Sequence, residues 1–174
     1  MECIATTRSF DKDVDTFDEL KRLTAFTSHA AEKLRAQNSL CHVMNLFVET
    51  NRFKETEIYY CKPIQLRLPF ATSSTLEMVA FVMGLKHIYP PNLHYKKAGV
   101  TLSEFVDVDC VKPLFFNSDP KHKELMKVMD KVNTTNPNLV RLAGMDKKTF
   151  KMRQEHLSPA YTTNLRDVLK VKVG

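Results

Sequence analysis

The sequence predicts an α+β fold of the ferredoxin-like βαββαβ type, in which a four-stranded, largely antiparallel sheet carries two helices on one face. Two observations lead to this prediction. Segments rich in strand formers alternate with two segments of helical periodicity, in the order strand, helix, strand, strand, helix, strand. Each helical segment has a single apolar stripe, so both helices should cover the same face of the sheet. The opposite face should then be polar and open.

The first strand and the first helix are expected within the first 38 residues. Residues 2–10 contain Ile4, Thr6 and Thr7, which favour an extended backbone. Residues 16–19 have the form of a capping box, which predicts the start of a helix that ends near residues 37–38. One face of this helix recurs at helical spacing, at Leu20, Leu23, Thr27, Ala30, Ala31 and Leu34.

Two further strands are expected at residues 40–50 and 57–68. The link between them, residues 51–55, is short, which predicts a hairpin. In the second of these strands the apolar side chains alternate with Gln65 and Arg67, so these two should point away from the core. Pro63 suits an edge strand or a bulge, because proline cannot donate a ladder hydrogen bond.

The second helix and the last strand complete the domain. Residues 74–77 form another capping-box pattern, and Pro90 and Pro91 end the helix that follows. Its apolar stripe is expected at Met78, Phe81, Val82 and Leu85. In the last strand, residues 94–102, the inward side chains are expected to be Ala98, Val100 and Leu102, and the outward ones Tyr95, Lys97 and Gly99.

The chain divides into three predicted parts: a domain at residues 1–105, a linker or extended arm at 106–118, and a small, mostly helical or irregular extension at 119–174. Asp119 can cap a third helix, with Pro120 at its first position. The buried stripe of that helix is expected at Leu125, Val128, Met129 and Val132. Because the first strand begins almost at Met1, we expect the chain to be one part of a longer protein.

Composition excludes several classes of function. No stretch approaches the roughly 20 apolar residues of a membrane helix, and the amino terminus lacks the order of a signal peptide, so a cytoplasmic location is expected. The four cysteines form no CxxC pair and are expected to be free, partly buried thiols. No metal site is expected, since Asp107 and Asp109 have no third ligand nearby, and no catalytic constellation is present. The net charge is +6, and residues 106–174 hold most of the excess.

Short motifs in the tail resemble the carboxy-terminal extension of UmuC-type translesion DNA polymerases. The similar segments run in order along the tail: Leu114-Phe115-Phe116, Glu124-Leu125-Met126, Ala143-Gly144, Lys151-Met152-Arg153, and Leu157 with the SPAYTT stretch that follows it at residues 158–163. The first part is similar to the little finger of the same family. Its matching segments are Thr7-Arg8-Ser9-Phe10, Ala30-Ala31-Glu32-Lys33-Leu34-Arg35, Tyr59-Tyr60 and Tyr95-Lys96-Lys97-Ala98-Gly99-Val100.

This resemblance implies a non-catalytic fragment of an error-prone, Y-family polymerase that acts in the bacterial SOS response to DNA damage. The polymerase active site and its Mg²⁺ ions would belong to the parent protein, and no cofactor is expected in this fragment. The little finger would grip the primer–template backbone, whatever its sequence, through the open sheet face. The residues proposed for this contact are Thr7, Arg8, Ser9, Gln65, Arg67 and Lys97.

The resemblance also implies protein partners. The tail would dock the processed UmuD dimer, with the sliding clamp and RecA as further partners. A clamp-docking motif of the QLxLF form would correspond to residues 112–116 here, with Leu114, Phe115 and Phe116 as anchors and without the Gln. Asp11 also departs from the family, which often has Gly at that position.

One alternative keeps the fold and changes the role. Ferredoxin-like sheets also serve as RNA-binding or small-ligand regulatory modules unrelated to a polymerase. An RNA-recognition module would carry aromatic residues on its central strands to stack bases, for which Tyr59 is a candidate. The characteristic RNP pattern is absent. A comparison of duplex DNA with single-stranded RNA in one binding assay would separate the two readings.

Overall fold

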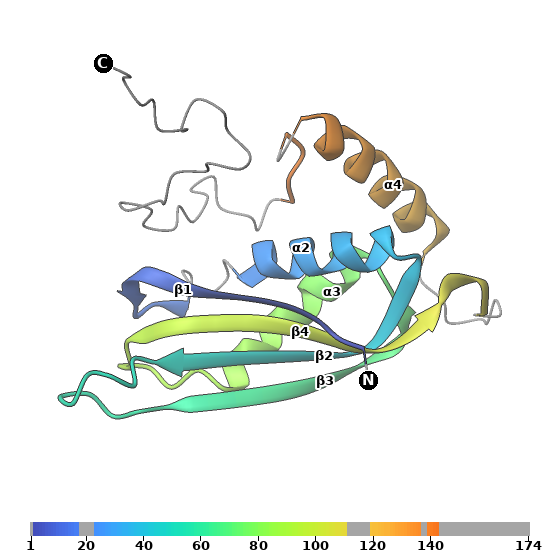
Figure 1. Ribbon diagram of the computed structural model, residues 1–174. Coiled ribbons are helices and arrows are strands. Elements are labelled where there is room, and N and C mark those ends of the chain that lie inside the picture. The colour runs from blue at the N-terminus through green and yellow to red at the C-terminus, as the bar shows by residue number, and fades with distance from the viewer. Residues whose placement is uncertain (1, 18–22, 111–118, 137–138, 143–174) are drawn as a thin grey trace, which may run out of the picture.

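A four-stranded sheet with helices on one face forms the body of the protein (Figure 1). The computed structural model describes residues 2–17, 23–110, 119–136 and 139–142. The predicted α+β class, with its strand and helix order, is confirmed. The elements are β1 (Ile4–Val14), α2 (Leu23–Ala36), β2 (Ser39–Thr50), β3 (Cys61–Thr72), α3 (Thr75–Val82), the 3-10 turn η1 (Met83–His87), β4 (Tyr95–Asp107), the 3-10 turn η2 (Val108–Cys110) and α4 (Pro120–Thr135).

The strands lie in the order β1–β4–β2–β3, and every neighbouring pair is antiparallel. Helix α2 therefore joins two parallel strands, β1 and β2, that have β4 between them. Helix α3 likewise joins β3 and β4 across β2. The second and fourth strands are central, whereas the ferredoxin arrangement places the first and third strands in the centre. Both orders contain two split βαβ units, so the element order alone does not choose between them.

The apolar core lies between the sheet and helices α2 and α3 (Figure 1). Burial of each large aliphatic side chain contributes about 1.5–3 kcal/mol, which makes this layer the main source of stability. The predicted stripe of α2 is buried at each of its described positions, and Asn38, with a φ of 54°, follows the end of that helix as expected. The sheet contributes buried side chains from its central strands: Met44, Leu46, Val48, Ala98, Val100 and Leu102.

Strand β3 begins later than predicted. It starts at Cys61 rather than residue 57, so Tyr59 and Tyr60 lie in the connection and the link is longer than residues 51–55. Thr50 closes this longer loop, since its hydroxyl Oγ1 donates to the Ile58 carbonyl at 3.1 Å and accepts from the Tyr60 amide at 2.8 Å. Within the strand the predicted alternation is confirmed, and β3 is the edge strand that Pro63 requires.

The prediction that Tyr95 faces away from the core is wrong, because this side chain is fully buried. The pairing of β2 with β4 shifts register between Glu49 and Thr50, so that Glu49 faces Lys97 and Thr50 faces Tyr95. The extra residue on β4 reverses the alternation and turns Tyr95 into the core. Its hydroxyl donates to the Pro90 carbonyl at 2.9 Å, which satisfies the buried polar atom.

The capping box predicted at the start of α3 does not form. Ser74 occupies the N-cap position, but its hydroxyl makes no cap hydrogen bond. Thr72 replaces it in part, because its Oγ1 accepts from the Ser74 amide at 3.0 Å and donates to Glu77. The capping box predicted at residues 16–19 lies partly outside the described residues. The stripe of α3 is buried at Met78 and Val82 and partly buried at Phe81.

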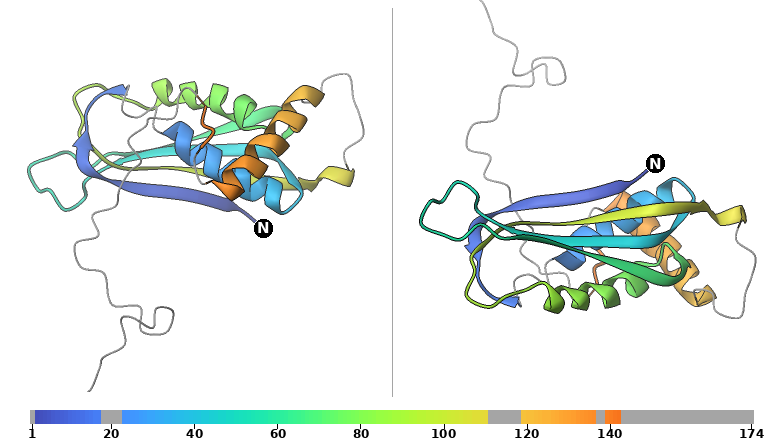
Figure 2. Two further views of the ribbon diagram at one scale, coloured as in Figure 1. Left: turned by 90° about the horizontal axis from the view of Figure 1, so that it is seen from above. Right: turned by 90° about the horizontal axis from the view of Figure 1, so that it is seen from below.

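Helix α4 lies above α2, on the side away from the sheet (Figures 1 and 2). Asp119 caps it as predicted, since the carboxylate oxygen Oδ1 accepts from the Lys121 amide at 2.9 Å. The predicted buried stripe is wrong at Leu125 and Val128, whereas Met129 and Val132 are partly buried. Met126 is the buried apolar side chain, whereas Leu125 is 45% exposed and Val128 is 61% exposed.

One ion pair and one polar contact explain which face of α4 turns inward. The Arg35 guanidinium on α2 donates to both carboxylate oxygens of Asp130, at 2.6 and 2.7 Å. His122 Nδ1 lies 3.0 Å from Glu77 Oε1 on α3. His122, Met126 and Asp130 are spaced four residues apart, so one stripe of the helix carries both polar contacts and the buried methionine.

The cysteines differ from one another in exposure. Cys41 is buried, and burial raises the pKa of its thiol to about 12, so it stays protonated at neutral pH. Cys3, Cys61 and Cys110 are exposed, contrary to the predicted partial burial. Among the described residues, no helix has the length and apolar character needed to cross a membrane.

Candidate nucleic-acid interface

The sheet face opposite α2 and α3, called here the outer face, carries side chains from all four strands. Its members alternate along each strand with the buried residues of the core. The pairing registers place them in rows that cross the sheet from β1 to β3. The rows are Ser9–Lys97–Glu49–Cys61, Thr7–Gly99–Phe47–Pro63, Ala5–Thr101–Asn45–Gln65 and, starting at β4, Ser103–Val43–Arg67.

Hydroxyl and amide groups are the most frequent polar groups on this face. Seen from below, it is covered by none of the described helices (Figure 2). Each of the four rows contains at least one hydroxyl or amide group, and Thr7, Ser9 and Gln65 are exposed. Neutral hydrogen-bond donors of this kind, together with basic side chains, bind phosphate oxygens without reading bases. The outer face can therefore hold a nucleic-acid backbone.

Lys97 is one of two basic side chains on the outer face, and an aromatic ring supports it. Its ammonium nitrogen lies 5.9 Å from the centroid of the Phe47 ring on the neighbouring strand. Phe47 in turn lies over Gly99, where an added Cβ would be 2.5 Å from the ring atom Cε1 and 2.6 Å from Thr7 Cγ2. Glycine at this position therefore lets the ring lie close to the sheet and support the lysine.

Arg67 is the second basic side chain, at the opposite end of the outer face. It extends from the edge strand β3 and is 74% exposed. One guanidinium nitrogen lies 3.4 Å from the Glu104 carboxylate, whose side chain is 38% exposed. An exposed pair of this kind contributes little to stability, so the guanidinium can exchange its partner for a phosphate at small cost.

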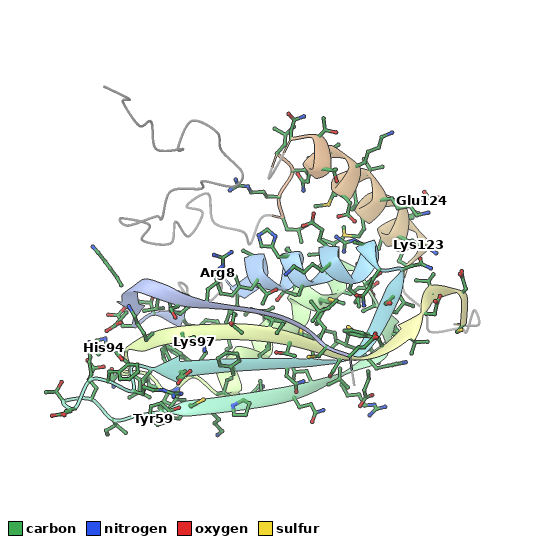
Figure 3. All side chains as sticks on the ribbon, in the orientation of Figure 1. Arg8, Tyr59, His94, Lys97, Lys123 and Glu124 are labelled. Atoms are coloured by element: carbon green, nitrogen blue, oxygen red, sulfur yellow. The ribbon has the colours of Figure 1, made fainter. Side chains whose placement is uncertain are left out.

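Arg8 lies on the other side of the sheet, which corrects the prediction that all six proposed residues share one face. It pairs with Ala98, a buried core residue, whereas Thr7 pairs with Gly99 and Ser9 with Lys97 on the outer face. Figure 3 shows Arg8 on the side of β1 that faces α2. The cause is strand geometry, since three consecutive residues of a strand cannot share one face. The remaining five predicted residues, Thr7, Ser9, Gln65, Arg67 and Lys97, do share it.

Sequence reasoning missed several members of the outer face. Asn45, Phe47 and Glu49 come from β2, which was predicted only as a long apolar strand. Their alternation with Met44, Leu46 and Val48 was the signal that could have identified them. Thr101 lies within the predicted last strand but was not assigned to a face, and Ser103 lies beyond that strand. The proposed docking residues Leu114, Phe115 and Phe116 fall outside the described residues.

Glu49 is the single carboxylate in the four rows, and it is almost fully buried. Its carboxylate accepts from Arg52 at 2.7 Å and from the Tyr59 hydroxyl at 3.2 Å (Figure 3 labels Tyr59 and Lys97). The Arg52 hydrogen bond, opposed by burial and aided by Tyr59 and the charge of Lys97, holds the pKa of Glu49 below its usual range. The group is therefore an anion at neutral pH.

The described residues contain no cluster of three or more His, Cys, Asp or Glu side chains that could hold a metal ion. Asp107 and Asp109 are exposed, and the Asp107 carboxylate accepts from the Asp109 amide at 2.9 Å in a local turn.

Curated relatives match almost the whole chain. Protein MucB of Escherichia coli is 31% identical over 169 residues, which cover 95% of this chain and 40% of the relative. Protein UmuC of Salmonella typhimurium is 31% identical over 176 residues, with 97% and 42% covered, and Protein ImpB of the same species is 29% identical over 177 residues, with 98% and 42% covered. The chain spans about two fifths of the length of these relatives.

Two solved structures are also similar. A complex of the β-clamp processivity factor with the little finger domain of PolIV has a TM-score of 0.41 at 10% identity, and covers 68% of this chain and 96% of that one. The insertion ternary complex of the Dbh DNA polymerase has a TM-score of 0.44 at 6% identity, with 61% and 29% covered.

Family models match two separate regions. Residues 123–171 match a domain of unknown function, DUF4113. Residues 2–112 match the model of the impB/mucB/samB family C-terminal domain, which covers the sheet and helices α2 and α3. The resemblance seen in the short motifs is confirmed by this match, which spans more than half of the chain. The chain belongs to the impB/mucB/samB family, as a C-terminal domain of that family with an extension behind it.

Proposed function

We propose that this chain is the non-catalytic, DNA-gripping part of a UmuC-type, Y-family translesion polymerase that works in the cytoplasm during the bacterial SOS response. The observation that carries the proposal is the outer face, where hydroxyls, amides, Lys97 and Arg67 share one uncovered side of the described sheet. Membership of the impB/mucB/samB family supports the polymerase context. The Mg²⁺ ions and the chemistry of nucleotide addition belong to the rest of the parent protein.

The outer face would act on the primer–template duplex through its phosphates. Lys97 and Arg67 supply positive charge at opposite ends of the face, and neutral donors such as Thr7, Ser9 and Gln65 lie between or beside them. Phosphate contacts give affinity and position but carry no sequence information. This mode of binding suits a polymerase that must hold any template, damaged or intact.

Salt-dependent binding tests the proposal. The 174-residue chain is titrated onto a labelled primer–template duplex at roughly 50–200 mM salt, and the variant Lys97→Ala/Arg67→Ala is compared with the unchanged protein. Loss of two phosphate contacts should lower the log–log salt slope by roughly 2 and weaken binding about tenfold at the low end of that range.

A matched control removes two positive charges from the helical layer, on the other side of the sheet. Lys33→Ala/Lys123→Ala changes two exposed lysines on α2 and α4 (Figure 3 labels Lys123) and should leave the slope nearly unchanged. Equal losses in the two double variants, or none in either, would refute the proposed face. Single-stranded RNA that binds more tightly than duplex, with loss on Phe47→Ala, would favour the RNA-binding alternative, since Phe47 lies on a central strand.

We also propose that the extension docks polymerase partners, with the processed UmuD dimer first among them. Leu125 and Val128 favour this role, because they expose apolar surface on α4 one turn apart. Leu125→Ser/Val128→Ser should weaken capture of the processed UmuD dimer at least fivefold, whereas Lys127→Ser on the same helix should not. Undiminished capture by the double variant would rule out this face of α4. A clamp contact through Leu114, Phe115 and Phe116, and a link to RecA, stay predictions of the resemblance.

A further inference from the structure

We propose that Glu49 limits the affinity of the outer face for nucleic-acid backbone, because it holds Arg52 in an ion pair and offsets the charge of Lys97. Arg52 is then a further phosphate-binding residue, and its ion pair with the Glu49 carboxylate leaves it only partly available to a phosphate. This inference rests on the proposed function of the outer face. It assigns to one buried acid the role of an affinity-limiting residue in an otherwise neutral and basic surface.

Glu49 is the direct neighbour of Lys97 on the outer face. It lies in the row Ser9–Lys97–Glu49–Cys61, directly between Lys97 on β4 and the start of the edge strand β3. Its side chain is only 9% exposed, although it points to the uncovered face of the sheet. A carboxylate at such a position repels any phosphate that approaches the adjacent lysine, and the low exposure reduces screening by salt.

Arg52 contacts both Glu49 and Tyr59. One guanidinium nitrogen, Nη2, binds Glu49 Oε1 at 2.7 Å, and the guanidinium carbon lies 5.8 Å from the centroid of the Tyr59 ring. The side chain is still 60% exposed. A guanidinium has five N–H donors, so an arginine held through one nitrogen retains donors for a phosphate.

The charge state of Glu49 decides whether it can repel a phosphate. The low pKa of Glu49 keeps it ionised at neutral pH, so its charge is present under the conditions of DNA binding. Conversion to glutamine removes that charge but leaves an amide oxygen that can still accept from Arg52 and Tyr59. Glu49→Gln therefore separates the electrostatic role from the role of Glu49 in holding the connection between β2 and β3.

Glu49→Gln should bind the primer–template duplex about 3- to 10-fold more tightly than the unchanged 174-residue chain at roughly 100 mM salt, with a log–log slope steeper by about 1. Glu57→Gln is the matched control. It removes the same charge from the same connection, where Glu57 pairs with Lys54 at 3.0 Å, outside the rows of the outer face. Its affinity should change less than twofold. Thermal unfolding of each variant confirms that it folds.

A second comparison assigns the gain to its source. The gain in duplex affinity from Glu49→Gln should fall by at least half in an Arg52→Ala background. The remaining part of that gain should be lost in a Lys97→Ala background. An unchanged affinity of Glu49→Gln, an equal gain from Glu57→Gln, or a full gain in both backgrounds overturns this inference while duplex binding stands. A chain that binds no duplex, with or without Glu49, overturns the proposed function and this inference together.

Discussion

At the scale of single residues, strand alternation decides which side chains can reach a ligand. Thr7, Arg8 and Ser9 were predicted as one contact, but their registers place Arg8 against the core layer and its neighbours on the outer face. The sequence contained the information for this correction, since consecutive strand residues point to opposite faces. Gln65 and Arg67 are two residues apart, and for the same reason the prediction that both point away from the core is confirmed.

Gly99 illustrates a residue whose role depends on its neighbours in space. Gly99→Ala should destabilise the protein by about 1–3 kcal/mol, because the new methyl group would overlap both Phe47 and Thr7. It should also weaken duplex binding, since displacement of Phe47 removes the ring that supports Lys97. Urea unfolding and the duplex titration measure the two effects.

Gly84→Ala is the control for that substitution. An added Cβ at Gly84 would lie 3.2 Å from Leu66 Cδ1, the flexible end of a side chain. Alanine also costs less chain entropy than glycine in the short turn η1, so this variant should be neutral or slightly more stable. If both variants were equally destabilised, close packing at Gly99 would not be the cause.

At the scale of elements, periodicity predicted where strands and helices occur but not how they register. The core face of α2 was predicted from its spacing, and the described residues match it. Tyr95 was assigned to the wrong face because the register shift between β2 and β4 has no mark in the sequence. The late start of β3 has a similar origin, since Thr50 holds Ile58 and Tyr60 in the connection.

Helix α4 shows how polar contacts between helices can determine which face of a helix turns inward. Asp130→Ala should release the helix from α2 and raise amide hydrogen exchange in α4 by roughly 5- to 100-fold, equivalent to about 1–3 kcal/mol for a partly exposed, doubly hydrogen-bonded pair. Amides of the central strands should keep their protection. Lys131→Ala, at the next and exposed position, is the control and should change little. Equal exchange in α4 of the unchanged protein and Asp130→Ala would show that the Arg35 pair does not hold the helix.

At the scale of the whole molecule, the two regions matched by family models meet through side chains of α2, α3 and α4. Arg35 lies in the first region and Asp130 in the second, and Glu77 and His122 form the second link. Arg35 also donates to the Thr75 hydroxyl on α3 at 2.9 Å, so one guanidinium joins α2, α3 and α4. The helical layer therefore connects the two regions, while the outer face lies on the opposite side of the sheet (Figure 1).

The sequence by itself determined the class of fold, the order of the elements, the α2 stripe, the Asp119 cap and part of the outer face, including Lys97 and Arg67. Each of these follows from local periodicity or from short-range capping, which depend on residues a few positions apart. Only the tertiary structure decided the strand order, the burial of Tyr95, the inward face of α4 and the contact of Glu49 with Arg52 and Lys97. These features depend on registers and ion pairs between segments far apart in the chain, and local patterns carry no record of such pairings.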